Sequence, residues 1–323
     1  MTLVERLDRF QQSHPRAGVP IAVVYKFADD QGSYLAALIT YYGFLAIFPL
    51  LLLSSTILNF VLEGQPDLQQ RLLDSAVGQL PIVGPQLADP QGIRGSGIGL
   101  AIGILGTLYG GLGVAQAAQN AMNTIWRVPR NDRPNPLTGR LRGLGLLLIV
   151  GLAVVGTTFL ATLGSIFDGF GLGTKIAIGI GTLVLNAAVF TTAFRVATAR
   201  PITLRQTLPG AVAAALVWQM LQYIGAFYVG HVMRNATEIN GVFALVLGLI
   251  AWIYLESVIV VLAVEYNTVR SLGLYPRALM TPFTDDVDLT PADEASYTQQ
   301  AEAARAKGFE EITVDFDEPP DPT

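Results

Sequence analysis

Six long apolar stretches, separated by short polar connections, dominate the pattern of hydrophobic and polar positions along the 323-residue chain. A membrane-spanning helix needs about 20 mostly apolar residues, because each residue rises about 1.5 Å across a hydrocarbon core of about 30 Å. All six stretches reach that length. The pattern therefore predicts an all-α protein with six transmembrane helices. The predicted spans cover residues 35–62, 96–118, 144–167, 174–196, 207–230 and 241–266.

Two segments outside these spans also show helical spacing of apolar residues. Their side chains recur every three or four positions, with Arg6 and Arg9 interleaved in the first segment. Such segments form helices that lie on a membrane surface, or short helices that pack on other parts of a protein. We expect interfacial amphipathic helices on both sides of the membrane. The apolar positions are Leu3, Val4, Leu7 and Phe10 in the first segment, and Leu68, Leu72, Leu73, Ala76 and Leu80 in the second, which covers residues 66–80.

The composition favours the same class of protein. Only 14% of the residues are charged and 51% are hydrophobic, whereas a soluble domain carries about 25% charged residues on its wetted surface. This excludes a soluble enzyme. Cysteine is absent, which excludes disulfide bonds and thiolate metal ligands.

The basic residues predict the orientation of the spans. Sixteen of the 20 lysines and arginines fall in the N-terminal segment, the second and fourth connections, and the C-terminal segment. Because basic residues accumulate on the cytoplasmic side, both termini are predicted to lie in the cytoplasm. The N-terminal 20 residues lack the apolar stretch of a cleaved signal peptide, so the first span is expected to direct insertion.

The composition changes near the C-terminus. Twelve of the 25 acidic residues lie from Asp285 onward, and prolines recur at the end. A segment with so little apolar surface cannot offset the entropy lost on ordering. We predict three parts: a cytoplasmic N-terminal segment with an interfacial helix (1–34), a six-span membrane domain (35–280) and an acidic, disordered cytoplasmic tail (281–323).

Three motifs follow one another along the chain. Their residues are Tyr41, Tyr42 and Pro49 in the first motif, Asn123, Trp126, Pro129 and Arg133 in the second, and Glu265 and Asn267 in the third. In this order and spacing they resemble the YihY/BrkB family of bacterial inner-membrane proteins over roughly residues 20–280, with the minor departure that Ala263-Val264 stand where the family pattern has Gly-Ala. The resemblance implies a six-helix fold in the inner membrane. It implies little about activity, because members have been labelled ribonuclease BN, virulence factor and transporter of lipid-like substrates.

The ribonuclease label finds no support in these residues. A metal-dependent nuclease holds its cations with clustered His, Asp or Glu side chains. The only two histidines, His14 and His231, are predicted on opposite sides of the membrane. We expect no enzymatic activity, metal, cofactor or nucleic-acid partner, and the oligomeric state stays open. Five arginines of the second connection are expected to anchor it or to bind anionic lipid headgroups: Arg127, Arg130, Arg133, Arg140 and Arg142.

Polar side chains inside the predicted spans are the best candidates for a substrate or proton site, because each is costly in lipid unless it is paired or hydrated. Glu256 lies near the middle of the sixth span. The alternative is that these groups only form hydrogen bonds between helices. Glu265, nearer the cytoplasmic end, is expected either to extend towards the membrane interface or to form an ion pair, for example with Arg270. The other candidates are Gln219, Gln222 and Tyr223 on one face of the fifth span and Asn186 in the fourth.

Two features predict helix packing. Pro49 lacks a backbone donor and predicts a kink in the first span. Small residues at every fourth position let another helix approach the second span, and we expect that helix to come from the same chain. These residues are Gly95, Gly99 and Gly103, followed by Gly106 and Gly110.

The sequence thus favours a non-enzymatic protein of the cytoplasmic membrane that transports or handles a lipid-like or amphipathic substrate. The alternative is a structural or assembly protein that organises an envelope complex through its basic connections and acidic tail. A ribonuclease is disfavoured.

Overall fold

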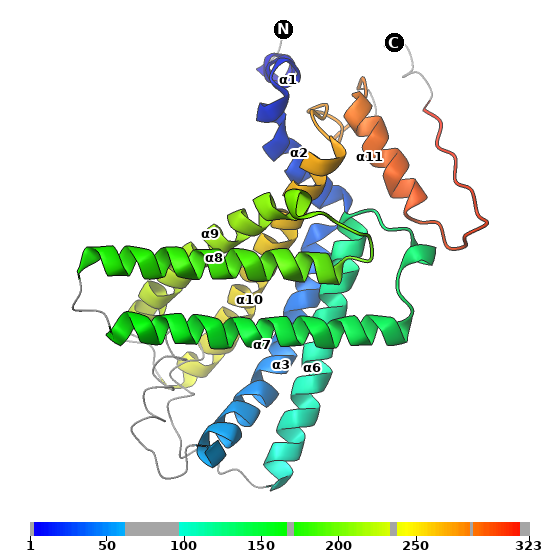
Figure 1. Ribbon diagram of the computed structural model, residues 1–323. Helices are drawn as coiled ribbons and strands as arrows, with labels where there is room; N and C mark the ends of the chain where they lie inside the picture. Colours follow the sequence, from blue (N-terminus) through cyan, green and yellow to red (C-terminus); the bar gives the residue numbers. More distant parts are fainter. Residues whose placement is uncertain (1–2, 62–96, 167–170, 233–237, 285–286, 317–323) are drawn as a thin grey trace.

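Every regular element in the described part of the chain is a helix. The computed structural model describes residues 3–61, 97–166, 171–232, 238–284 and 287–316. The predicted interfacial segment 66–80 lies outside these ranges. Each predicted span coincides with one helix (Figure 1): α3 (Gly32–Val61), α6 (Gly97–Ile125), α7 (Pro136–Ile166), α8 (Leu172–Ala197), α9 (Leu204–Val232) and α10 (Glu238–Leu272). The remaining elements are α1 (Leu3–Ser13), α2 (Pro15–Asp29), the short 3-10 helix η1 (Arg130–Asp132) and α11 (Pro291–Glu302).

Four helices are long and apolar enough to cross a membrane, judged on the described residues by length and composition. Their apolar parts are Pro136–Gly164, Leu172–Ala197, Leu204–Gly225 and Val246–Leu272. In α3 the corresponding stretch, Gly32–Ile47, is shorter. The structure therefore supports an all-helical membrane protein, whereas the six-span count and the interfacial position of α1 stay predictions.

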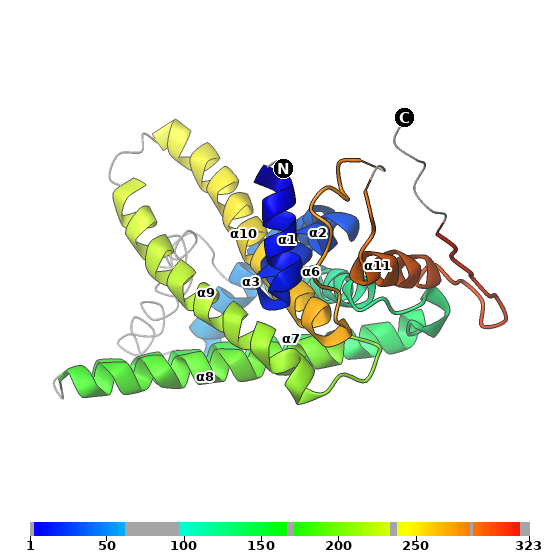
Figure 2. The ribbon, with the colours of Figure 1, turned by 90° about the horizontal axis from the view of Figure 1, so that it is seen from above.

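The helices form two groups that cross one another. α3 packs along α6, while α10 contacts α2, α3 and α9. α7 and α8 form a hairpin that lies across α3 and α6 at a steep angle, with α8 also packed against α9 (Figure 1). Seen from above, α9 and α10 run side by side, away from the region where α1, α2 and α11 lie (Figure 2).

Small residues of α6 bring it close to α3. A Cβ atom at Gly110 would lie 2.7 Å from the Cα atom of Ala46, which real structures do not tolerate without a shift of backbone. A Cβ atom at Gly106 would lie 2.7 Å from the ring of Pro49. The expected packing of this glycine face within one chain is confirmed for these two positions.

The buried apolar core lies at one end of the helices. It is built from the C-terminal turns of α6, α8 and α10, the start of α9 and the connection between α8 and α9. Trp126, directly after α6, is a fully buried member of this core. The other large members are Met122, Ile125, Phe194, Ile202, Val261 and Val264.

By contrast, the α7–α8 hairpin exposes apolar stripes along most of its length. The side chains recur at helical spacing and are between 53% and 67% exposed. A helix that exposes so much apolar surface suits a lipid environment and not water. The stripes consist of Leu148, Leu152, Val155 and Phe159 on α7, and of Ile176, Ile180 and Val184 on α8.

The structure corrects the expectation of disorder within the acidic tail, because residues 291–302 form α11. The Thr290 hydroxyl accepts from the backbone N–H of Asp293, whose carboxylate accepts from the Thr290 N–H in return, and Pro291 stands at the first helical position. This capping box satisfies backbone donors that would otherwise be unpaired at the helix start. Composition alone does not detect such a signal.

Candidate functional site

Four charged side chains meet at the well-packed end of the helices, with Lys26 at their centre. Its ammonium donates to Glu265 Oε2 at 2.9 Å, to the backbone oxygen of Ile125 at 2.8 Å, and to Asp30 one turn later on the same segment. The side chains of Lys26, Asp30 and Glu265 are fully buried. We call Lys26, Asp30, Arg127 and Glu265 the buried charge cluster.

Arg127 completes this cluster from the connection after α6. Its Nη1 lies 2.6 Å from Asp30 Oδ1, and its side chain is 5% exposed. Arg127 has a φ of 53°, in the left-handed region that non-glycine residues seldom adopt. Two buried cations thus face two buried carboxylates, which balances the charge and ties α2, the α6–η1 connection and α10 together.

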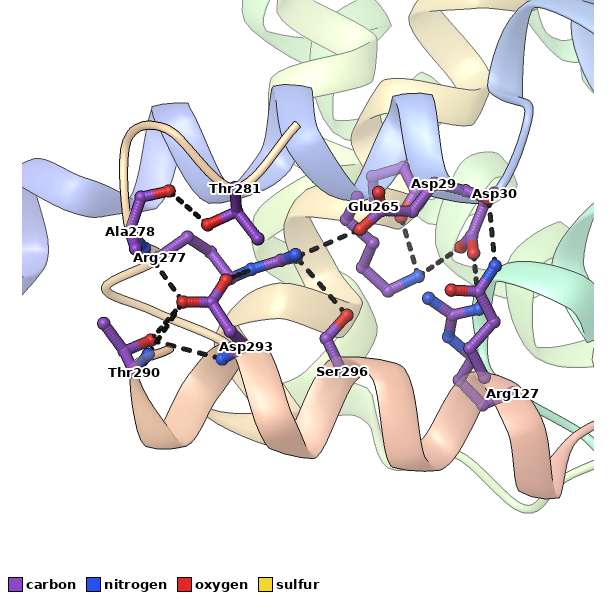
Figure 3. Close-up of polar contacts among 12 residues, drawn as sticks. Asp29, Asp30, Arg127, Glu265, Arg277, Ala278, Thr281, Thr290, Asp293 and Ser296 are labelled. Carbon is purple, nitrogen blue, oxygen red and sulfur yellow. Dashed lines mark hydrogen bonds and ion pairs between the residues drawn. The ribbon is translucent and has the colours of Figure 1, made fainter. Parts of the chain in front are cut away.

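A second charged group lies beside this cluster, around Arg277 (Figure 3). The Arg277 guanidinium contacts Asp29 Oδ2 at 3.1 Å, the Ser296 hydroxyl at 3.3 Å, and the carboxylate of Asp293. Burial by itself lowers the pKa of Arg277, but the hydrogen bond that Arg277 donates to Asp293 and the charges of Asp29 and Asp293 outweigh it, so the pKa is raised. These contacts fasten α11 to α2.

The structure changes the expected partner of Glu265. That carboxylate pairs with Lys26, while Arg270 is exposed on the last turn of α10. The predicted ion pair with Arg270 is therefore wrong, because Arg270 lies more than one helical turn along from Glu265 on the exposed face. Arg127 was expected among the residues that bind lipid headgroups, but its burial against Asp30 removes it from the surface.

An open pocket of about 740 Å³ lies where α7 begins and α8 ends. Arg142 comes from α7, Arg195 from α8, and Arg200 from the connection to α9. Arg195 Nε donates to the backbone oxygen of Ile202 at 2.9 Å. The remaining lining residues are Thr192, Val196, Thr198, Ala199, Pro201, Ile202 and Thr203, so none of the described residues that line this pocket is acidic. We call it the arginine pocket.

Several residues of the three sequence motifs hold the connections at this end. The side-chain oxygen of Asn123 accepts from the backbone N–H of Ala199 at 2.8 Å, which ties the pocket connection to α6. Asn267 accepts from the Gly210 N–H at 2.8 Å and donates to the Thr207 oxygen at 2.9 Å, and so joins α10 to α9.

Arg133 folds back over its own connection. It donates to the backbone oxygen of Val128 at 3.2 Å and to the side chain of Asn120 at 3.1 Å. Burial and the nearby charge of Arg130 lower the pKa of Arg133. Of the aromatic motif residues, Tyr41 is exposed and Tyr42 is half-buried near Gly113 of α6, while Pro129 directly precedes η1.

The candidates of the fourth, fifth and sixth spans are not gathered into one described pocket. Glu256 accepts a 2.7 Å hydrogen bond from Trp252 Nε1, one turn earlier on α10. Gln219, Gln222 and Asn186 are half-buried, and Tyr223 is 71% exposed. The role of these residues as a substrate or proton site stays a prediction.

Lys26 and Asp30, two members of the buried charge cluster, were not identified from the sequence as candidate functional residues. Their spacing of four residues is the signal that could have suggested a local ion pair. Glu265 follows Lys26 by 239 residues, so no local pattern could join them. In the part of the chain that the structure describes, no group of three or more His, Asp or Glu side chains could hold a metal ion.

Known proteins resemble this chain at modest identity. A UPF0761 membrane protein of Azotobacter vinelandii is 27% identical over 251 residues, which cover 74% of this chain and 60% of that protein. The match thus spans about 60% of the length of this relative. A UPF0761 membrane protein of Pseudoalteromonas atlantica is 23% identical over 293 residues, covering 86% of this chain and 95% of that protein.

A further relative, the ribonuclease-like protein YfkH of Bacillus subtilis, is 22% identical over 256 residues, covering 75% of this chain and 91% of that protein. No solved structure matches the chain significantly. Residues 23–280 match the virulence factor BrkB family. That range contains all four residues of the buried charge cluster and the whole arginine pocket. The chain is therefore a membrane protein of the virulence factor BrkB family.

Proposed function

We propose that this protein transports or handles a lipid-like, amphipathic substrate at the cytoplasmic membrane. One observation carries the proposal: the arginine pocket lies at the end of the hairpin that exposes the apolar stripes. Arg142 stands in the second turn of α7, shortly before the stripe that begins at Leu148. A polar headgroup in the pocket would contact basic side chains, and an apolar chain along the hairpin would contact apolar side chains.

Native mass spectrometry of the purified protein tests this function directly. The protein, extracted in a mild detergent, is expected to retain a lipid-like molecule whose mass can be read from the complex. A matched preparation of an unrelated membrane protein from the same cells controls for lipid carried over from the membrane. Retention no greater than in that control would contradict the proposal and favour the structural or assembly function.

The proposal also holds that the protein is not a ribonuclease, although one relative is named ribonuclease-like. The purified protein should leave a labelled RNA intact with and without added Mg²⁺ or Mn²⁺. Degradation that copurifies with the protein and disappears in a variant would overturn this part of the proposal.

A further inference from the structure

The arginine pocket gathers positive charge from three separate segments. Its guanidinium groups belong to α7, α8 and the connection between α8 and α9. None of the three arginines forms an ion pair with a carboxylate of the described residues. Elsewhere at this end, Lys26, Arg127 and Arg277 are all paired with acids. The three pocket arginines thus line one pocket without a carboxylate partner among the described residues, and a surface with this charge favours an anion.

One guanidinium nitrogen among the pocket arginines is a hydrogen-bond donor without an acceptor in the described part of the chain. Arg142 Nη1 is shielded from solvent and has no hydrogen-bond acceptor among the described residues. A buried donor without an acceptor is unfavourable, and more so when it is charged. An anion that this group of Arg142 reaches by a change of rotamer would supply that acceptor.

Hydrogen bonds and burial within the protein also fix the backbone around the pocket. Asn123 accepts a hydrogen bond from the Ala199 N–H, and Arg195 donates one to the Ile202 backbone oxygen. The Ile202 side chain is buried in the core. The connection from 198 to 203 is therefore anchored on α6 and α8. A site whose backbone is already fixed loses less conformational entropy when it binds.

From these observations we infer that the arginine pocket binds a phosphate-bearing group. Guanidinium forks match phosphate oxygens in pairs, and three arginines from different segments can engage a tetrahedral group with several charged oxygens. The hydroxyls of Thr192, Thr198 and Thr203 add donors to the same lining. This inference rests on the proposed function in one respect only, since it names the headgroup of the substrate expected at this pocket.

The phosphate could belong to a lipid headgroup or to a soluble molecule. The lipid arm of the test uses the full-length protein in nanodiscs of phosphatidylcholine with increasing phosphatidylglycerol, or with oleate as a carboxylate anion. The soluble arm uses inorganic phosphate and glycerol phosphate added to the protein in detergent. Binding is measured by native mass spectrometry and by the rise in melting temperature.

The test variant is the triple substitution R142Q/R195Q/R200Q, and its matched control is R16Q/R205Q/R270Q. The control removes the same charge from three exposed arginines that do not line the pocket. We expect the test variant to bind phosphatidylglycerol or the soluble phosphate at least about tenfold more weakly, and the control to bind as the native protein does. If the triple variant does not fold, the single variant R200Q replaces it, because Arg200 is exposed.

Each result decides the inference. Equal losses in both triple variants, or equal binding of oleate and phosphatidylglycerol, would overturn it, as would no binding of any probe. A retained lipid that is insensitive to the three arginines would overturn it while leaving the proposed function standing. Arginine-dependent binding of soluble phosphate without any lipid would support the inference and contradict the proposed function.

Discussion

The Lys26 ammonium has three acceptors and no solvent around it, and two of those acceptors are carboxylates. A buried ion pair adds little net stability over an apolar replacement, because both charges lose their hydration. Removing one partner is different, since the other charge then stays buried and uncompensated. The buried charge cluster is therefore most informative when single and paired substitutions are compared.

We expect Lys26→Met to lower the free energy of unfolding by about 3–5 kcal/mol, because it leaves Asp30 and Glu265 with one cation between them. K26M/E265M removes one charge of each sign and should be more stable than the single variant. Arg270→Gln is the control and should have little effect, because Arg270 is exposed. Thermal unfolding in detergent measures all three. A loss in Arg270→Gln equal to that in Lys26→Met would show that the pairing is misassigned.

At the scale of elements, the contact of α3 with α6 depends on the absence of a side chain at Gly110. The two backbones meet there, so a larger residue cannot be accommodated by moving a flexible side chain. Gly151 on α7 offers the matched case, because nothing lies within 4 Å of a Cβ atom built there.

Gly110→Val should therefore destabilise the protein by about 1–3 kcal/mol, since it forces α3 and α6 apart. Gly151→Ala should be neutral or stabilising by up to about 1 kcal/mol, because alanine favours the helix over glycine. Melting temperatures of the two variants in the same detergent provide the comparison. Tolerance of valine at position 110 would mean that the two helices are not in close contact.

The positions of the helices could be predicted from the sequence, whereas the contacts between side chains of different helices could not. Apolar length and composition are local properties, so all six predicted spans coincide with helices of similar bounds. The pairing of Glu265 depends on which helix of the folded protein lies opposite, and sequence spacing therefore led to Arg270. α11 was missed because an acidic composition outweighed the signal Thr290-Pro291-Ala292-Asp293, which predicts a capped helix start. Arg142 was among the arginines expected to anchor the connection or to bind headgroups, whereas Arg195 and Arg200 were not singled out, because no local pattern places them beside Arg142.

At the scale of the whole molecule, the C-terminal segment links parts of the chain that are distant in sequence. Asp293 reaches Arg277, Gln300 donates to the backbone oxygen of Asp29 at 3.1 Å, and Arg305 donates to Asn131 at 3.1 Å. α11 and the residues after it thus contact α2 and η1, which makes this part of the predicted tail a component of the fold.

Truncation after Thr284 should accordingly lower the free energy of unfolding by about 1–3 kcal/mol, because buried Arg277 loses Asp293 and keeps only Asp29. Truncation after Phe316 is the control and leaves these contacts intact. Unchanged melting temperatures for both variants would show that the segment after Thr284 adds nothing to the stability of the fold.

The predicted orientation can be tested on a clean background, because the native chain has no cysteine. In intact cells, Asn135→Cys and Thr203→Cys should be shielded from a membrane-impermeant thiol reagent, whereas Pro90→Cys should react. Permeabilised cells provide the control for reactivity at all three positions. Labelling of Asn135→Cys in intact cells would contradict the predicted placement of both termini in the cytoplasm.

The separation between Lys26 and Glu265 also sets an order of events during biosynthesis. At roughly 5–20 residues per second, the ribosome needs about 12–48 s to make the 239 residues from one to the other. Through that interval Asp30 is the only carboxylate of the cluster yet synthesised, and it lies close enough along the chain to neutralise Lys26. Arg127 then emerges before Glu265, so each new charge of the cluster alternates in sign with the one before it. The nascent chain therefore never has to hold more than one unbalanced charge of this cluster while its helices enter the bilayer.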